Sequence, residues 1–359
     1  MDNTKNAPRV TKESKNKIRV EFEGRTPLLE RLKSKFLSTY FLTNVVWYLF
    51  RLILLIGVSY VILFPFFSKI AGSFMSPSDL VDPTVSIIPK APTVEIYKAI
   101  VVENSYFTAL WNTLVLSLSS AILQTFVCML IGYGLAKFRF KGNGLIMVLV
   151  VLTMIVPHET IKLSMMMHFT YFDLGGIQGL GIPGIISYIT GIFGGSLGGG
   201  TTLNLMNTYI PLIMLSVLGL GFKNGLYIFM MRQFYTGVPD ELEESAYVDG
   251  SNTFRTFFQI ILPLSVPMMI TIFLFSFCWQ WTDSFYTSLF FKGGKTILMP
   301  NIVQTPPSLE AAADYAAQTL YTTVISNTCG MMIIFPLVIL YLFCQRFLIQ
   351  GIERSGLVG

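Results

Sequence analysis

The chain has 359 residues, of which 53% are hydrophobic and only 13% are charged, and its mean hydropathy is +0.62. Soluble globular domains carry about 25% charged residues, so this composition indicates a protein embedded in lipid. With two histidines and no complete phosphate-binding glycine loop, the sequence offers little material for a metal cluster, a catalytic triad or a nucleotide site. We therefore expect no catalytic residue, no metal site and no cofactor bound by this chain.

Residues 1–44 form a polar, basic extension. Two interpretations of it are open: a segment that lies on anionic lipid headgroups, or a disordered tail. Because some forty polar residues precede the first apolar stretch, we expect no cleavable signal peptide. The apolar stretches all fall within residues 45–350, which we treat as one transmembrane domain, and residues 351–359 form a short tail.

Six apolar stretches are long enough to cross a membrane as helices. Their continuous apolar character is typical of helices, since barrel strands alternate apolar and polar residues. The sequence therefore predicts an all-α integral membrane protein with six transmembrane helices. The stretches are Val46–Ile70, Thr108–Leu135, Leu145–Thr170, Thr208–Met231, Leu264–Phe291 and Thr322–Phe347.

Lys and Arg are concentrated on one side of these predicted spans. Eighteen lie at the N-terminal end, in the second-to-third and fourth-to-fifth connections and in the tail, against four in the other connections. By the positive-inside rule, both termini are expected in the cytoplasm. The positive residues flank membrane spans, so we expect no nucleic-acid partner. The four cysteines fall within predicted spans and are interpreted as small buried residues rather than disulfides.

The external connections differ in composition. Residues 72–107 are rich in proline and are expected to be extended and turn-filled. The connection between the third and fourth spans holds eleven glycines between Gly175 and Gly200 and carries no charge. It is either a flexible loop or a re-entrant hairpin at an outer mouth, and the cost of leaving an apolar loop in water favours the hairpin. We place this glycine-rich external insertion at about 175–203.

The cytoplasmic connection at about 236–263 is acidic although it lies between two apolar spans. Pro239 suits the first turn of a helix, and the acidic residues at 240–244 favour its positive end. Gly250 permits the reversal that ends this helix. The first half of the connection is therefore predicted to be a short acidic helix that projects into the cytoplasm.

A second helix is predicted to follow, with Ser251 as its cap. Its apolar residues recur at i, i+3, i+4 and i+7, which places them on one face toward the bundle. Leu262-Pro263 is expected to end this helix and to start the fifth span. The apolar residues are Phe254, Phe257, Phe258 and Ile261.

The spacing of this connection, Glu-x-Ala-x3-Gly-x9-Ile-x-Leu-Pro from Glu244 to Pro263, resembles the "EAA" loop of ATP-binding-cassette (ABC) importer permeases. Ser245 stands where the family usually has a central Ala. Similarity to the carbohydrate branch, and to its maltose-type second permease, extends over about residues 45–350. The insertion and the shortened glycine-rich ending depart from the family pattern. Further similar segments are Asn112-Thr113-Leu114, Ala136-Lys137-Phe138, Arg232-Gln233-Phe234 and Gln345-Arg346-Phe347.

The resemblance implies a type I ABC importer permease fold and a transport subunit that is not itself an enzyme. In such importers the acidic helix sits in a groove of a cytoplasmic ATPase, and ATP-driven closure of two ATPases rocks the spans between inward-facing and outward-facing states. Expected ATPase-coupling residues are Glu243, Glu244, Ser245, Ala246, Asp249, Gly250, Ile260, Leu262 and Pro263.

The resemblance also implies the partners and the location. They are a second homologous permease subunit, two ATPases that bind ATP and Mg²⁺, an external solute-binding protein, a sugar substrate and the lipids of a bacterial cytoplasmic membrane. Two alternatives stay open: an importer of the same superfamily for a non-sugar solute, and an ion-gradient-driven secondary carrier.

Several polar and aromatic residues inside the spans are candidates for the substrate pathway. Ionisable groups at that depth are costly and often line a water-filled path, and Pro157 loosens its helix. The alternatives are a self-neutralising Glu159–Lys162 pair and tryptophans that anchor at the membrane interface. The candidates are Glu159, Lys162, Lys223, Trp279, Trp281 and Asp283.

Overall fold

The computed structural model describes residues 10–13, 17–20, 39–172, 204–292, 296–310 and 318–356. The chain divides into two compact units, Met1–Ser68 and Lys69–Gly359. The expected re-entrant element at 175–203 lies outside the described residues.

The N-terminal unit contains an antiparallel strand pair and most of one long helix. Strand β1 (Val10–Glu13) pairs with β2 (Lys17–Val20), and Val10 faces Val20. Helix α2 (Thr39–Gly72) begins in this unit and ends in the next. This strand pair departs from the expected all-α class, because the β-branched residues Val10, Thr11, Ile18 and Val20 favour pairing within the basic extension.

The described part of the second unit is helical. Its elements in chain order are α3 (Pro77–Val81), α4 (Glu95–Glu103), α5 (Tyr106–Lys137), α6 (Asn143–Ile155), η1 (His158–Ile161), α7 (Lys162–Thr170), α9 (Ile210–Val217), α10 (Asn224–Thr236), α11 (Glu241–Val248), α12 (Thr253–Thr256), η2 (Phe257–Ile261), α13 (Leu262–Trp281), α14 (Phe285–Phe290), η3 (Met299–Ile302), α15 (Pro307–Glu310) and α16 (Gln318–Gly356).

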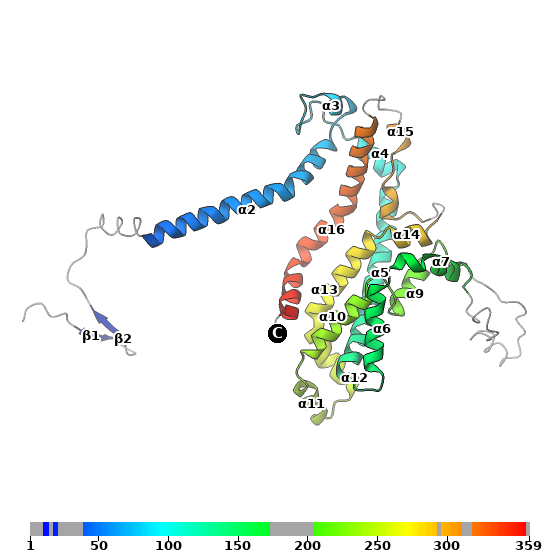
Figure 1. Ribbon diagram of the computed structural model, residues 1–359. Coiled ribbons are helices and arrows are strands. Elements are labelled where there is room, and N and C mark those ends of the chain that lie inside the picture. Colours follow the sequence, from blue (N-terminus) through cyan, green and yellow to red (C-terminus); the bar gives the residue numbers. More distant parts are fainter. Residues whose placement is uncertain are drawn as a thin grey trace, which may run out of the picture. The chain divides into compact units, whose positions relative to one another are not determined.

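Helix α5 is the centre of the second unit. It packs against α9, α10 and α13, and α13 packs in turn against α16 (Figure 1). Gly132 lets α5 and α10 approach closely, since a Cβ added there would lie 2.5 Å from Met231 Cβ. Cys128 and Met129 of α5 are fully buried in the same core as Met231. All four cysteines are free; Cys128 and Cys329 are buried as expected, whereas Cys278 and Cys344 are half-buried.

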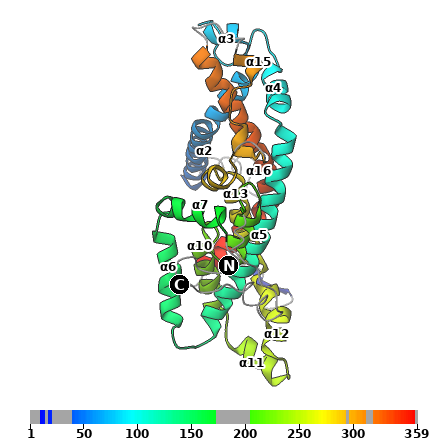
Figure 2. The ribbon, with the colours of Figure 1, turned by 90° about the vertical axis from the view of Figure 1, so that its right-hand side faces the viewer.

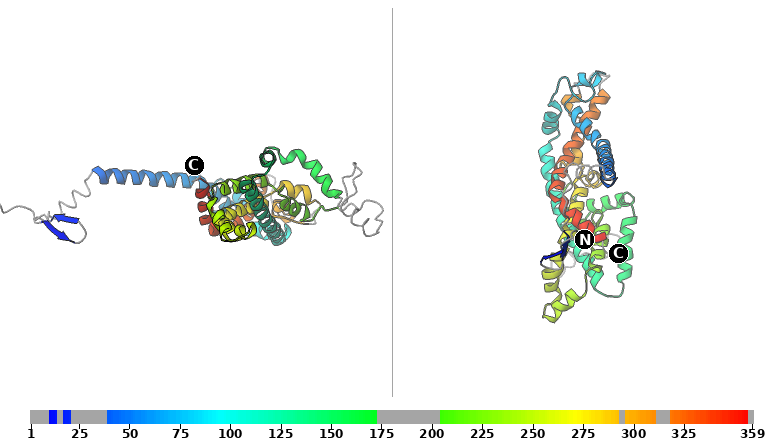
Figure 3. Two further views of the ribbon diagram at one scale, coloured as in Figure 1. Left: turned by 90° about the horizontal axis from the view of Figure 1, so that it is seen from below. Right: turned by 90° about the vertical axis from the view of Figure 1, so that its left-hand side faces the viewer.

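The two ends of this unit carry different elements. Helices α11 and α12 lie at one end of the bundle, and α3, α4 and α15 lie at the opposite end (Figure 2). Figure 3 shows the ribbon from below and from the left-hand side of Figure 1, and α5 packs against α10 and α13. A change at the α11 end therefore has one continuous helix, α5, along which it can reach the opposite end.

Four described helices are long and apolar enough to cross a membrane, which confirms four of the six predicted spans as single helices. These four correspond to the first, second, fifth and sixth predicted spans. The third is broken: Asn143–Ile155 and His158–Thr170 meet at 91° around Pro157. The fourth is divided into α9 and α10 by a turn that contains Gly219 and Gly221. Within the described residues the count is thus four, or five if the bent pair is one span.

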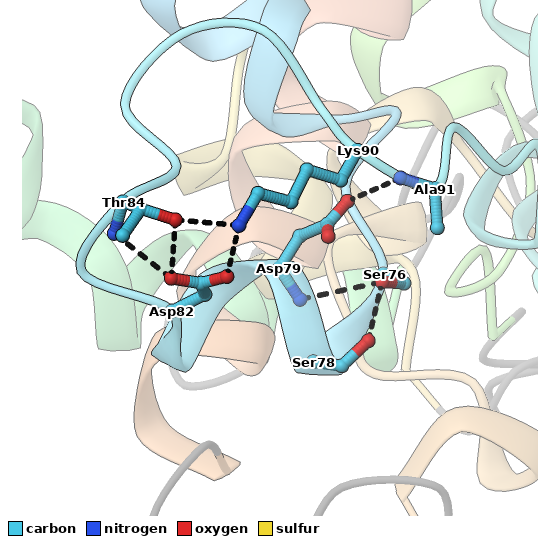
Figure 4. Close-up of polar contacts among 7 residues, drawn as sticks. All are labelled: Ser76, Ser78, Asp79, Asp82, Thr84, Lys90 and Ala91. Carbon is cyan, nitrogen blue, oxygen red and sulfur yellow. Dashed lines mark hydrogen bonds and ion pairs between the residues drawn. The ribbon is translucent and has the colours of Figure 1, made fainter.

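The first external connection is more ordered than expected, because it folds into α3 and α4. Lys90 Nζ lies 2.6 Å from Asp82 Oδ2 and also donates to Thr84 Oγ1 (Figure 4). The hydrogen bond from Lys90 lowers the pKa of Asp82. Asp79 accepts a hydrogen bond from the Ala91 amide at 3.1 Å. These local contacts, which sequence patterns at proline-rich segments do not reveal, fix the loop on α3.

Candidate functional site

The predicted acidic helix of the cytoplasmic connection is present as α11. It begins at Glu241, so Pro239 lies ahead of the cap residue Asp240 rather than in the first turn. Gly250 adopts φ +81°, the left-handed conformation that ends the helix, as predicted. Glu244, Ser245 and Asp249 are exposed, which leaves one acidic edge of the helix open for a partner.

The second part of the connection differs from the prediction. Asn252, not Ser251, caps it, because the Asn252 side chain accepts a hydrogen bond from the Arg255 amide at 2.8 Å. One helical turn, α12, then passes through the π-helical η2 directly into α13. Pro263 therefore does not end a helix. It has no N–H to donate, and the wider π turn just before it accommodates that loss.

The expected single apolar face is also divided. Phe257 and Ile261 are buried, whereas Phe254 is 77% exposed and Phe258 is exposed as well. The extra residue in the π turn changes the helical phase, so that i, i+3, i+4 spacing no longer describes one face. Ile260 and Leu262 are half-buried and Pro263 is exposed. The exposed phenylalanines extend the surface next to α11.

Two residues expected on the partner-facing surface point inward instead. Glu243 and Ala246 are buried, at 8% and 5% exposure. On a helix they lie three residues apart and share one face, which α11 turns toward the bundle. The opposite side presents Tyr247 and Val248, and Val248 is 87% exposed. The outer surface of α11 is thus partly apolar, a composition that suits a protein groove.

Lys137, the last residue of α5, joins the connection to the bundle. Its Nζ lies 2.6 Å from the Val238 carbonyl oxygen, 2.5 Å from Asp240 Oδ1 and 4.0 Å from Glu243 Oε1. The Lys137 side chain is only 6% exposed. We call this group the Lys137 junction. A cation at a helix C-terminus is favoured by the helix dipole. The carboxylates of Asp240 and Glu243, at the start of α11, then hold α11 against this end of α5 by opposite charge.

Tyr133, one turn earlier on α5, completes the contact. Its hydroxyl lies 3.5 Å from Glu243 Oε2, and its ring packs against Phe257 at 4.8 Å and Tyr235 at 5.5 Å between centroids. Burial raises the pKa of Glu243, and the nearby Lys137 charge opposes that rise. Lys137 bonding lowers the pKa of Asp240. The end of α5 therefore contacts α10, α11 and η2 together.

A second candidate site lies where the two broken spans meet. The break between α6 and α7 and the break between α9 and α10 face one pocket of about 670 Å³. Discontinuous helices at membrane depth are tolerated where they line a cavity, because their open backbone groups then find other partners. Polar groups on the wall come from His158, Glu159, Lys223 and Asn224, and the remainder is mostly apolar.

The candidate pathway residues are brought together only in part. Glu159 and Lys223 line the pocket, and Trp279 lies beside it, with Lys223 Nζ 5.1 Å from its ring centroid. Lys162 does not line the pocket, and its Nζ lies 5.9 Å from the Phe285 ring. Among the described residues Glu159 and Lys162 form no ion pair with each other.

The last two candidates have structural contacts. Trp281 is 1% exposed and its indole N–H donates to the Ile333 carbonyl at 3.0 Å. Residues two apart on a helix face different sides, so Trp279 and Trp281 do not share the pocket. Asp283 is buried and accepts a hydrogen bond from the Thr287 amide at 3.1 Å, at the start of α14.

Sequence reasoning missed three residues of these sites. Lys137 was counted as a topology signal and within a family-like segment but not as a site residue, although a lysine in the last helical turn opposite an acidic loop is a recognisable pattern. Tyr133 gave no signal, because its partner lies 110 residues away. His158 lines the pocket and its Nδ1 lies 2.9 Å from the Tyr286 hydroxyl. Its position beside Pro157 was the available clue.

Known proteins resemble this chain over most of its length. The family described as binding-protein-dependent transport system inner membrane component matches residues 128–354. The arabinooligosaccharides transport system permease protein AraQ of Bacillus subtilis (strain 168) is 28% identical over 305 residues, 84% of this chain and 92% of AraQ. The galactooligosaccharides transport system permease protein GanQ of the same organism is 26% identical over 315 residues, 87% of this chain and 95% of GanQ.

A solved structure shares the fold. A bacterial ABC transporter involved in the import of the acidic polysaccharide alginate matches with a TM-score of 0.59 at 17% sequence identity. The match covers 85% of this chain and 97% of that chain. At this identity the likeness concerns the fold alone.

Proposed function

The chain belongs to the family of binding-protein-dependent transport system inner membrane components, and on that premise we propose that it is the permease subunit of an ATP-driven importer for a sugar or oligosaccharide. It is a multi-pass membrane protein of this family, with several apolar helices. Relatives that match along nearly their whole length are named for oligosaccharide transport, which supports the sugar assignment. We place the chain in a bacterial cytoplasmic membrane with both termini on the inner side.

The Lys137 junction is the observation that carries the mechanism. Glu244, Asp249 and Val248 on the outer surface of α11 are proposed to dock in a groove of a partner ATPase, where ATP and Mg²⁺ are bound. When that groove moves, α11 moves with it, and the buried Lys137 ammonium transmits the displacement to α5. Packed helices have few alternative arrangements, so the displacement is passed on as a rigid-body motion.

Helix α5 extends the displacement to the pocket. Gln124, in the middle of α5, donates from Nε2 to Ser216 Oγ of α9 at 3.3 Å and accepts from Ser276 of α13. A Cβ added to Gly221, which lines the pocket, would lie 2.6 Å from Gln124 Nε2. One helix therefore contacts both the coupling loop and the pocket wall. This continuity favours a gate driven by an ATPase over an ion-gradient carrier, which needs no docking helix.

The partners follow from the same proposal. A second homologous permease would supply the other half of the path, and each permease would dock one ATPase. An external solute-binding protein would bind the end of the bundle that carries α3, α4 and α15. The loop between α3 and α4, which Lys90 and Asp82 fix in place, exposes Ile88 to 82% and is suited to such a contact.

The test uses the importer assembled from this chain, its sister permease, the ATPases and the binding protein. Glu244→Lys reverses charge on the docking edge, and Gly250→Pro cannot adopt the positive φ that ends α11. Both variants are expected to abolish sugar-stimulated ATP hydrolysis, whereas the control Lys141→Glu, an exposed lysine between α5 and α6, retains it. Wild-type coupling in both loop variants would refute the proposal.

A further inference from the structure

Lys223 occupies an unfavourable position in the chain. It adopts φ +64°, the left-handed conformation that residues other than glycine rarely take. It is also the N-cap residue of α10, so its positive charge lies at the positive end of the helix dipole. Backbone strain of this kind persists at functional sites because the surrounding structure enforces it. The fold thus holds the Lys223 cation in place despite the strained backbone and the unfavourable helix dipole.

Nothing in the described protein neutralises this charge. Lys223 forms no ion pair with any acidic side chain of the described residues. Its Nζ instead lies 5.0 Å from the Phe222 ring centroid and 5.1 Å from that of Trp279. The two rings hold the ammonium at the pocket without cancelling its charge, since a cation–π contact leaves the cation free to bind an anion.

The neighbouring groups add unsatisfied donors. No side chain caps α10, and the first amides of a helix have no partner within it. Asn224 follows Lys223, lines the same pocket, is 1% exposed, and neither atom of its side-chain amide has a partner in the described protein. A buried amide without partners is costly, so a ligand or water is expected to satisfy it. The Asn224 backbone amide already donates to the Gly221 carbonyl oxygen at 3.0 Å, so the open donors of the α10 wall are the Lys223 ammonium and the Asn224 side-chain amide.

The opposite wall has a different chemistry. Glu159 on η1 supplies a carboxylate acceptor, and His158 is occupied by its contact with Tyr286. Trp279, which lies beside the pocket on the Lys223 side, is about half exposed, and its ring centroid is 5.1 Å from the Lys223 ammonium. The volume of about 670 Å³ falls within the range of about 300–1,000 Å³ that small-molecule pockets have.

We propose that this pocket binds an acidic carbohydrate, with its carboxylate or phosphate group on Lys223 and the N-terminus of α10. The sugar ring packs against Trp279, and its hydroxyls donate to Glu159. An anion at this point relieves the repulsion between Lys223 and the helix dipole and satisfies the open donors, which a neutral sugar does less well. The inference rests on the proposed function and names the substrate class of the importer.

The experiment uses the assembled importer in lipid nanodiscs without the binding protein, so that only the membrane site is read. A galacturonate trisaccharide, galactose 6-phosphate and the neutral galactose trisaccharide are titrated, and thermal stability is recorded. The two acidic sugars are expected to stabilise the wild type, and a larger effect of one identifies carboxylate or phosphate as the preferred group. The affinity for the neutral trisaccharide is expected to be lower by about tenfold or more.

Lys223→Asn is the matched variant, because asparagine tolerates the left-handed conformation and removes the charge. It is expected to raise the stability of the ligand-free importer and to weaken binding of the acidic sugars by about tenfold or more. Lys98→Asn, an exposed lysine on α4, is expected to change neither quantity.

Two results would overturn the inference: equal stabilisation by acidic and neutral sugars, or unchanged acidic-sugar binding in Lys223→Asn. Uptake into proteoliposomes that also contain the binding protein separates this failure from failure of the proposed function. ATP-dependent uptake of a neutral sugar, with no effect of Lys223→Asn, refutes the inference alone. Absence of ATP-dependent uptake of every sugar tested refutes the proposed function.

Discussion

Two lysines, Lys137 and Lys223, mark regions of this molecule that are built in opposite ways. Lys137 ends α5, where the helix dipole favours a cation, and its buried ammonium has a carbonyl and two carboxylates around it. Lys223 precedes α10, where the dipole disfavours a cation, and it is exposed without an ion pair among the described residues. In the first region the Lys137 ammonium has its partners within the chain, although Glu243 Oε1 lacks a hydrogen bond, whereas the second region has, among the described residues, a cation without an ion pair and a side-chain amide without a hydrogen bond.

This difference separates transmission from recognition. A coupling element transmits displacement only if its contacts are already made, and the Lys137 junction meets that requirement. A binding site needs groups that are not yet satisfied, and the pocket at the two broken spans provides them. Helix α5 connects the regions through Lys137 at its end and Gln124 in its middle.

Removing the Lys137 charge is expected to have the largest effect on coupling. Lys137→Met leaves Glu243 buried beside Asp240 without a cation, and breaking a buried pair from one side is strongly unfavourable. We expect sugar-stimulated ATP hydrolysis by the assembled importer to fall by about tenfold or more. Lys141→Met, an exposed lysine in the next turn, serves as control. Equal ATP hydrolysis in the two variants would show that the junction does not transmit.

A smaller loss is expected where α5 meets α10. In Gly132→Ala the new Cβ would lie 2.5 Å from Met231 Cβ, so the two helices must separate. Overpacking of this kind costs about 1–3 kcal/mol, which should appear as a lower melting temperature of the importer. Gly134→Ala is the matched control, because no atom lies within 4 Å of its added Cβ. If both variants melt alike, the close approach is not required.

Removing Lys223 is expected to increase the stability of the importer rather than decrease it. Lys223→Gly removes both the strained backbone and the cation at the start of α10, so the ligand-free importer should become more stable by about 1 kcal/mol. Thermal unfolding of Lys223→Gly and Lys137→Met side by side checks this contrast. Destabilisation by both variants would mean that Lys223, like Lys137, is a structural contact.

The smallest effect concerns the protonation of Glu243. Burial raises its pKa above the usual 4.5, so the folded protein holds this proton more tightly than the unfolded chain. The resulting contribution to stability is present below about pH 4.5 and is lost as pH rises through the raised pKa. Glu243→Gln should therefore flatten the melting temperature between pH 4.5 and neutrality. An unchanged pH profile would exclude Glu243 as the titrating group.

Features that depend on residues close together in the sequence were predicted, whereas contacts between residues far apart in the sequence were not. The acidic helix and its end at Gly250 follow from neighbouring residues, and both were predicted. The Lys137 junction was not, because Lys137 and Asp240 lie 103 residues apart and meet only in the folded bundle. The predicted cap residue of α12 was wrong, because Ser251 and Asn252 are both good helix caps. Only the folded turn selects Asn252.

The pocket was predicted in part for the same reason. Pro157 was expected to loosen the third span, because proline removes a backbone donor within the helix, but the 91° break there was not predicted. The break before α10 was missed, since Gly219 and Gly221 sit in an apolar stretch that reads as one continuous helix. Glu159 and Lys223 were selected because they are ionisable groups inside predicted spans, but that they share one pocket depends on two breaks that face each other.

The central claim, that α11 and the end of α5 move as one body, is tested most directly by joining them. In an importer in which the four cysteines of this chain are replaced, Lys137→Cys and Asp240→Cys are linked by a short reducible thiol cross-linker that restores the contact covalently. Because the two residues keep one arrangement throughout the cycle, the linked importer is predicted to retain ATP-driven sugar uptake at the level of the unlinked variant or above. Uptake that stops on linking and returns on reduction would contradict the account.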